Sequence, residues 1–142
     1  MEKYLVIIII LVFRSCSTNP RAINYNTDNC SYCKMTIVDQ IHATELVTEK
    51  GRIKVYDAIE CMLYDLKENP SVVYQHYKVN TYNAPKILED ASTSVYLISE
   101  ELPSPMGANL TAFKDSLSAL NVQKEIGGTL YSWSKLKQKF NL

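Results

Sequence analysis

The residues of this sequence whose types and spacing suit chemistry carry sulfur and gather in one short segment. Cys30, Cys33 and Met35 place three sulfur side chains close together, and a strand-like run at 36–38 follows directly. Thiolate and thioether are soft donors, which favour a soft monovalent ion such as Cu(I) over hard cations. A structural zinc site prefers four thiolate and imidazole ligands, and only Cys61 remains to complete such a set in the folded part. The segment therefore predicts copper binding.

Two other interpretations of the Cys30–Cys33 pair stay open. A structural disulfide is reasonable in an oxidising compartment. A thioredoxin-type redox pair requires a strand before the cysteines and a helix N-terminus after them, where the helix dipole lowers the thiol pKa. Here a polar stretch precedes the pair and a strand-like run follows it. This context favours metal binding over redox chemistry.

A second candidate ligand lies in the segment 102–107, which contains two prolines and a glycine. These residues restrict the loop and hold Met106 in a defined direction. Methionine on an exposed loop is an unusual choice for filling a core. Taken alone, Met106 is interpreted as a packing residue, whereas beside the Cys30 segment it becomes a candidate ligand from the other half of the chain.

Cys61 and His42 are further candidates. Cys61 falls on a predicted helix about 200° from Ile59, at 100° per residue. We interpret it as a small buried residue between the two halves, the alternative being an extra thiol near the metal. A single imidazole is a reasonable additional copper ligand, but His42 and His76 each fit an ordinary strand or surface position better.

The N-terminal segment resembles a targeting signal. Residues 5–13 form an unbroken apolar run, which is shorter than the roughly 20 residues of a membrane-spanning helix and fits the core of a secretory signal. Phe13 to Cys16 resembles a lipobox, with Arg14 in a slot that usually holds a small residue. We expect a signal peptide at 1–15, a lipid anchor on Cys16 and a polar linker at 16–29. The chain would then be exported and held on a bacterial membrane, facing the periplasm or cell surface; a cleaved soluble form is the alternative.

The charge balance and the motifs exclude several classes of function. Lys plus Arg and Asp plus Glu both number 15, giving a net charge of zero. A nucleic-acid binder normally shows a basic excess or stripe, so none is expected as a partner. The sequence shows no Ser-His-Asp order, Gly-rich phosphate loop or pair of carboxylates suited to catalysis, and we predict that the protein is not an enzyme.

Hydrophobic periodicity and turn signals predict an α+β fold made of two small β-β-α-β units packed together, at about 30–90 and 91–142 within a domain at 30–142. The first unit has a hairpin over 42–56 and a helix that begins with a capping box of Asp57 and Glu60 and stops at Asn69. The remaining expected elements are strands at 72–79, 95–99, 110–113 and 129–131, a helix capped at 115–116 and ending at 127–128, and a short helix at 134–140.

These motifs together resemble the NosL family of copper-binding lipoproteins, over about residues 30–133. The resemblance rests on the Cys30-x-x-Cys33-x-Met35 segment, the stretch 56–62, the strand at 95–96 and the loop 104–107. Glu60 stands where many relatives carry glycine. By this resemblance Cys30, Cys33, Met35 and Met106 are the sulfur ligands of Cu(I), and Cys61 belongs to a helix motif.

The resemblance also implies a role and partners. We expect a monomeric, non-catalytic metallochaperone that passes Cu(I) to a membrane copper-maturation transporter complex and then to nitrous-oxide reductase. An exported thiol-dependent enzyme or redox protein that uses Cys30 and Cys33 is the alternative.

Overall fold

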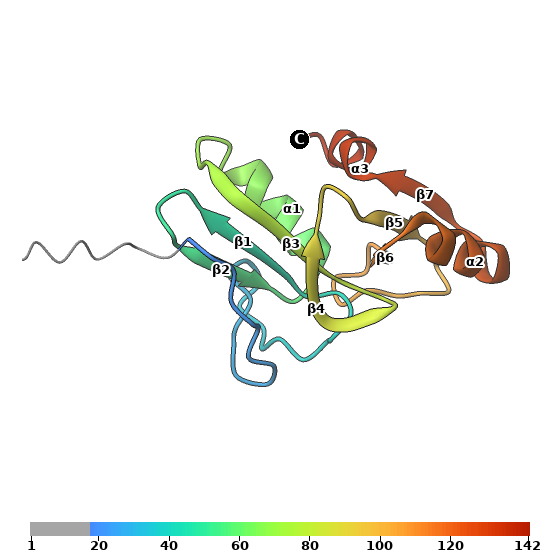
Figure 1. Cartoon of the computed structure of the whole chain (residues 1–142), viewed down its shortest axis with the longest axis horizontal. Helices are drawn as coiled ribbons and strands as arrows, with labels where there is room; N and C mark the ends of the chain where they lie inside the picture. The colour runs from blue at the N-terminus through green and yellow to red at the C-terminus, as the bar shows by residue number, and fades with distance from the viewer. Residues whose placement is uncertain (1–17) are drawn as a thin grey trace, which may run out of the picture.

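The computed structural model describes residues 18–142 and consists of two antiparallel sheets with three helices. The predicted signal peptide at 1–15 and the anchor Cys16 lie outside the described residues. One sheet has the strand order β2-β1-β3-β4 and the other β6-β5-β7. The elements shown in Figure 1 are β1 (Thr44–Thr48), β2 (Ile53–Tyr56), α1 (Ile59–Glu68), β3 (Tyr74–Thr81), β4 (Ala84–Asp90), β5 (Val95–Ile98), β6 (Leu110–Phe113), α2 (Ser116–Ile126), β7 (Thr129–Ser132) and α3 (Trp133–Lys139).

The predicted α+β class is confirmed. Each half follows the order β-β-α-β, and β4 is an additional strand of the first half. Strand β4 has no clear signal in the sequence, because most of its side chains are exposed or half-buried and its hydrophobic alternation is weak. As an edge strand it also tolerates Pro85, which has no backbone N–H to donate to a neighbour.

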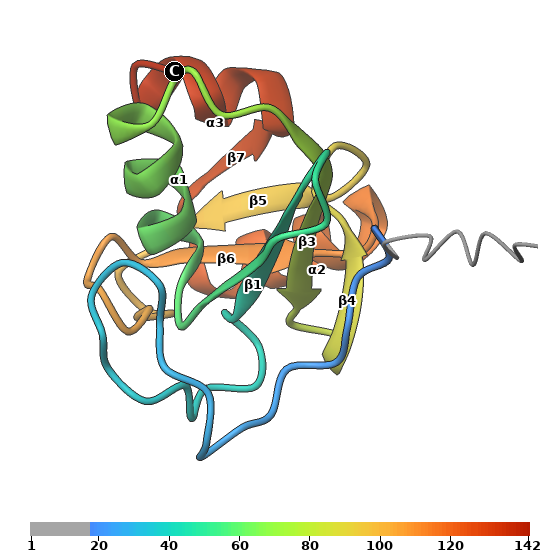
Figure 2. The same cartoon turned by 90° about the vertical axis from the view of Figure 1, so that its left-hand side faces the viewer.

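The two halves share one hydrophobic core. Leu46 and Val79 of the first sheet belong to the same buried cluster as Tyr96 and Leu110 of the second sheet and Leu136 of α3. Figure 2 shows the strands of the second sheet crossing behind those of the first, with α1 at their side. Units of this size are only marginally stable on their own, and the shared core buries additional apolar surface when they pack together.

Helix α1 forms where the apolar stripe predicts it. Ile59, Met62 and Leu63 are fully buried, and the helix ends at Asn69, just before Pro70. The predicted capping box is wrong, however. The N-cap residue is Ala58, and no side chain caps the helix; the carboxylates of Asp57 and Glu60 are both buried and have other partners.

The ordered domain begins before Cys30, which corrects the predicted extent of the linker at 16–29. Ile23 is buried in the main core, and the backbone N–H of Arg21 donates to Glu45 Oε1 over 3.1 Å. The strand-like run at 36–38 forms only an isolated bridge, between Asn29 and Thr36. Across residues 18–142, the helices are all too short or too polar to span a membrane.

Candidate metal centre

A tight turn brings Cys30 and Cys33 together at the end of β2. The backbone N–H of Cys30 donates to the carbonyl oxygen of Met35 over 2.8 Å, and Lys34, at φ 70°, donates back to the carbonyl of Cys30 over 3.1 Å. The backbone N–H of Ser31 donates to the carbonyl of Val55 over 2.7 Å. Since β2 leads directly into Asp57 and α1, these hydrogen bonds place the turn against the start of the helix.

Four side chains converge at this point. The sulfur atoms of Cys30, Cys33 and Cys61 and a carboxylate oxygen of Asp57 all lie within 4.8 Å of one another. Cys30, Asp57 and Cys61 are only 1%, 3% and 0% exposed, whereas Cys33 is half-buried. The Sγ of Cys33 donates to Asp57 Oδ1 over 3.4 Å. We call these four residues the thiol cluster.

The protonation of the thiol cluster is uneven. A hydrogen bond from Cys61 lowers the pKa of Cys30 to about 6. Burial raises the pKa of Cys33 to about 11, and the hydrogen bond with Cys30 is the largest of the effects that raise the pKa of Cys61. At neutral pH the cluster therefore holds one thiolate, Cys30, and two thiols. All three cysteines are free, so a soft cation could bind here with release of protons.

The two methionines predicted as ligands are accessible from solvent. Met35 is 49% exposed and Met106 is 37% exposed, so neither serves mainly to fill the core. Met35 follows the cysteine turn directly. Met106 lies in the loop between β5 and β6, and this loop is hydrogen-bonded to Glu60 through Ser104 and Ala108. Glu60 immediately precedes Cys61 in α1.

His42 is the candidate that the structure does not bring to the thiol cluster as a free ligand. It is buried, and both ring nitrogens are engaged: Nδ1 with Asp39 Oδ2 and Nε2 with Thr111 Oγ1, each over 2.9 Å. The imidazole therefore joins the segment before β1 to β6. His76 is half-buried in β3, where it pairs with Val47 of β1.

Sequence reasoning missed Asp57 as a site residue and favoured an interface position for Cys61, with an extra thiol near the metal as the alternative. Asp57 was interpreted as a helix cap, but its carboxylate accepts the hydrogen bond from Cys33 instead. Asp57 lies one residue before the N-cap Ala58 and is not part of the helix. Helical spacing therefore offers no sequence signal that pairs Asp57 with Cys61.

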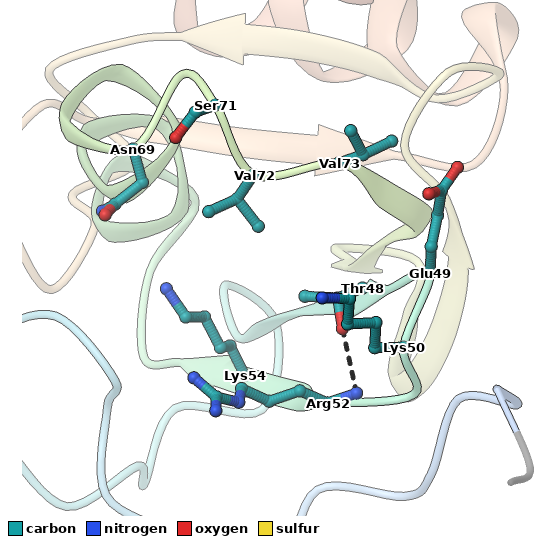
Figure 3. Close-up of a pocket in the computed structure, with 9 residues that line it drawn as sticks. All are labelled: Thr48, Glu49, Lys50, Arg52, Lys54, Asn69, Ser71, Val72 and Val73. Carbon is teal, nitrogen blue, oxygen red and sulfur yellow. Dashed lines mark hydrogen bonds between the residues drawn. The ribbon is translucent and has the colours of Figure 1, made fainter.

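A hollow lies at the end of β2 and α1 that is opposite to the thiol cluster. Its volume is about 600 Å³. As Figure 3 shows, Lys50, Arg52 and Lys54 line it, together with residues of the segment 69–73. Lys54 is paired with Asp65 over 2.7 Å. The lining contains no sulfur or imidazole, so it does not suit a soft metal ion.

The fold and the thiol cluster define a class of protein: a small α+β domain with a set of buried cysteines suited to holding a metal ion. Comparison with known proteins then places the chain. It belongs to the NosL family, whose profile matches residues 21–140, and the family resemblance seen in the sequence is thereby confirmed.

A solved structure supports the assignment of the fold. The crystal structure of the copper chaperone NosL from Shewanella denitrificans superposes with a TM-score of 0.71 and 19% sequence identity, covering 83% of this chain and 95% of that one. No match was found among curated proteins. At this level of identity the similarity establishes the architecture, and the chemistry must be argued from the residues of this chain.

Proposed function

We propose that this protein is a Cu(I)-binding metallochaperone. The observation that carries the proposal is the convergence of Cys30, Cys33 and Cys61 within 4.8 Å, with two exposed methionines on neighbouring segments. Thiolate and thioether donors prefer Cu(I). The family membership and the similarity to a copper chaperone support the same ion, and membership of this family is consistent with a non-enzymatic protein.

The arrangement of donors suits transfer of the ion. Cys30 supplies a buried thiolate that needs no deprotonation at neutral pH. Cys33 is half-buried, and its thiol donates to Asp57 Oδ1; it would lose its proton when the sulfur binds metal. Met35 and Met106 face solvent and offer weaker, neutral donors. An ion held between buried thiolates and exposed thioethers is accessible from one side, where donors of a partner protein can replace the thioethers by ligand exchange.

The burial of the thiols argues against the alternative of a thiol-dependent enzyme. A reactive cysteine combines a low pKa with access to substrate. Cys30 has the low pKa but is only 1% exposed, while Cys33 is more accessible but has its pKa raised to about 11. Neither residue combines the two properties.

We further propose that the chain is exported, lipid-anchored through Cys16, and delivers copper to a membrane transporter complex and then to nitrous-oxide reductase. This part of the proposal is supported by the signal-like run at 5–13 and by the family resemblance. The four-residue thiol cluster would make delivery an exchange between soft donors, and no catalytic step is required of this chain.

A competition titration tests copper binding. Reduced protein is titrated with Cu(I) against a strong Cu(I) chelator, for the natural sequence, Met35→Leu and Cys33→Ser. We expect near-stoichiometric binding, weakened in both variants. Failure of the natural protein to compete for Cu(I) contradicts the proposal. Loss of stability in Cys33→Ser without any copper competition indicates a structural role, and an unchanged affinity in Met35→Leu supports a thiol-only site.

A further inference from the structure

One buried carboxylate fastens the β5–β6 loop, residues 99–109, to helix α1. Glu60 is 0% exposed, and its Oε1 accepts hydrogen bonds from the hydroxyl of Ser104 and from the backbone N–H of Ala108, the latter over 3.2 Å. The Ser104 hydroxyl in turn accepts from the N–H of Leu110 over 3.3 Å. A single oxygen atom therefore holds the loop at two points, next to its junction with β6.

Met106 lies between these two points. The N–H of Gly107 donates to the carbonyl of Ser104 over 3.0 Å, which closes a turn with Pro105 and Met106 at its centre. Pro105 has its φ fixed by its ring, and Gly107 adopts φ 78°, which glycine allows at little cost. The backbone of the turn is restricted by these residues, and the hydrogen bonds to Glu60 join the turn to the helix.

The placement of Glu60 in the chain connects this loop to the thiol cluster. Glu60 directly precedes Cys61, but it is not among the four residues whose ligand atoms converge. Its second oxygen, Oε2, is buried without a hydrogen-bond partner among the described residues. Burying a half-satisfied carboxylate costs stability, so packing alone is a poor explanation for glutamate at this position.

We propose that Glu60 is a positioning residue that sets the thioether of Met106 beside the thiol cluster. The inference rests on the proposed Cu(I) function. Without the carboxylate, the turn would have to be ordered when the ion binds, and the entropy lost then would weaken the Met106 ligand. Residues that orient metal ligands typically change the metal affinity by about 10–100-fold when mutated, and we expect an effect in the lower part of that range.

A double-mutant cycle in Cu(I) affinity tests this role. The reduced full chain is titrated against a Cu(I) chelator as the natural protein, Glu60→Ala, Met106→Leu and the double variant. We expect each single variant to weaken binding by about 10-fold, and the double variant to be no weaker than Met106→Leu alone. A purely structural effect of Glu60 would instead persist in the Met106→Leu background.

Two matched variants separate positioning from folding. Glu60→Gln keeps an oxygen that can accept from Ser104 and Ala108, and it should retain most of the affinity. Glu101→Ala removes an exposed carboxylate from the same loop. Among the described residues, the Glu101 side chain has no hydrogen bond or ion pair, so its loss should leave the Cu(I) affinity unchanged. Should Glu60→Ala fail to fold, Ser104→Ala releases the same contact from the other side.

The outcomes distinguish this inference from the proposed function. If the natural protein does not bind Cu(I), the proposed function is wrong and the role of Glu60 falls with it. If it binds Cu(I) while Glu60→Ala has full affinity, or while the effects of Glu60→Ala and Met106→Leu multiply, copper binding stands and the positioning role is overturned. Unchanged affinity in Met106→Leu also overturns it.

Discussion

At the scale of single residues, the thiol cluster separates two roles that one cysteine could not fill. The hydrogen bond from Cys61 stabilises the thiolate of Cys30, while Cys33 stays protonated beside Asp57. The buried thiolate provides attraction for a cation, and the half-buried thiol leaves the cluster open on one side. The difference arises from burial and hydrogen bonding, since all three side chains are chemically identical.

The first prediction concerns the origin of the low pKa of Cys30. In metal-free, reduced protein, one thiol should ionise with a pKa near 6, and Cys61→Ala should raise this value toward the ordinary 9.0 because the hydrogen bond to the thiolate is lost. Thiolate absorbance as a function of pH provides the measurement. Cys33→Ser is the control and should keep the ionisation near pH 6. If that ionisation is lost only in Cys33→Ser, the thiolate belongs to Cys33 and the assignment to Cys30 is wrong.

The second prediction concerns Glu45, a buried carboxylate in β1. Burial raises its pKa to about 7 from 4.5, so the folded state holds a proton that the unfolded state has already released between these values. The free energy of unfolding therefore falls as pH rises from 4.5 to 7, and the loss is complete above 7. Glu45→Gln should remove this loss and be more stable than the natural protein at pH 8, by on the order of 2–3 kcal/mol.

Denaturant unfolding at pH 4 and at pH 8 provides the measurement for Glu45. Glu45→Gln keeps an oxygen that can accept from the backbone N–H of Arg21, as Glu45 Oε1 does over 3.1 Å. The two proteins should therefore have similar stability at pH 4. An equal difference at both pH values would mean that the titration of Glu45 is not the cause.

At the scale of elements, the junction of α2 and β7 shows how two adjacent glycines differ. Gly127 ends the helix at φ 75°, and a Cβ there would meet no atom within 4 Å. Gly128 lies at φ 106°, and a Cβ there would clash with the carbonyl oxygen of Ile98. The first glycine permits a backbone conformation, whereas the second permits close approach of β7 to β5.

The third prediction follows from this difference. Gly127→Ala should lower the free energy of unfolding by about 1 kcal/mol, because only backbone strain is added. Gly128→Ala should cost more than about 3 kcal/mol, because the backbone of β5 or β7 must also move. Urea unfolding of the two variants side by side gives the comparison, and equal costs would show that the contact with Ile98 is relieved without strain.

At the scale of the whole molecule, one core joins the two β-β-α-β units. The cluster that contains Leu46 and Tyr56 of the first sheet also contains Leu110 of β6 and Leu136 of α3. The backbone N–H of Tyr82 also donates to the carbonyl of Ala112 over 2.8 Å, joining the end of β3 to β6. The thiol cluster belongs to the first unit and Met106 to the second, so the donor set that we propose for copper would draw on both.

The fourth prediction is that the two units unfold together. Far-UV circular dichroism and the accessibility of Cys30 to a thiol reagent should follow a single urea transition, as expected for a small domain with a shared core. Leu110→Ala should lower the free energy of unfolding by about 2–5 kcal/mol and shift both signals equally. Two separated transitions would indicate independent units.

The sequence by itself determined most of the elements and the chemical character of the site, but not the edge strand β4. The stripe of Ile59, Met62 and Leu63 located α1, the turn residues located the hairpin, and the Cys30–Cys33–Met35 spacing indicated a soft metal. Periodicity and local turn chemistry depend on residues a few positions apart, so they can be recognised without knowing the fold.

Only the tertiary structure decided which side chains meet. It brought Asp57 and Cys61 to the cysteine turn, engaged both nitrogens of His42, and joined Glu60 to Ser104, 44 positions away along the chain. A hydrophobic pattern shows which face of an element is buried but not what packs against that face. The partner of a buried polar group is fixed by how the elements pack, and here that packing includes both halves of the molecule.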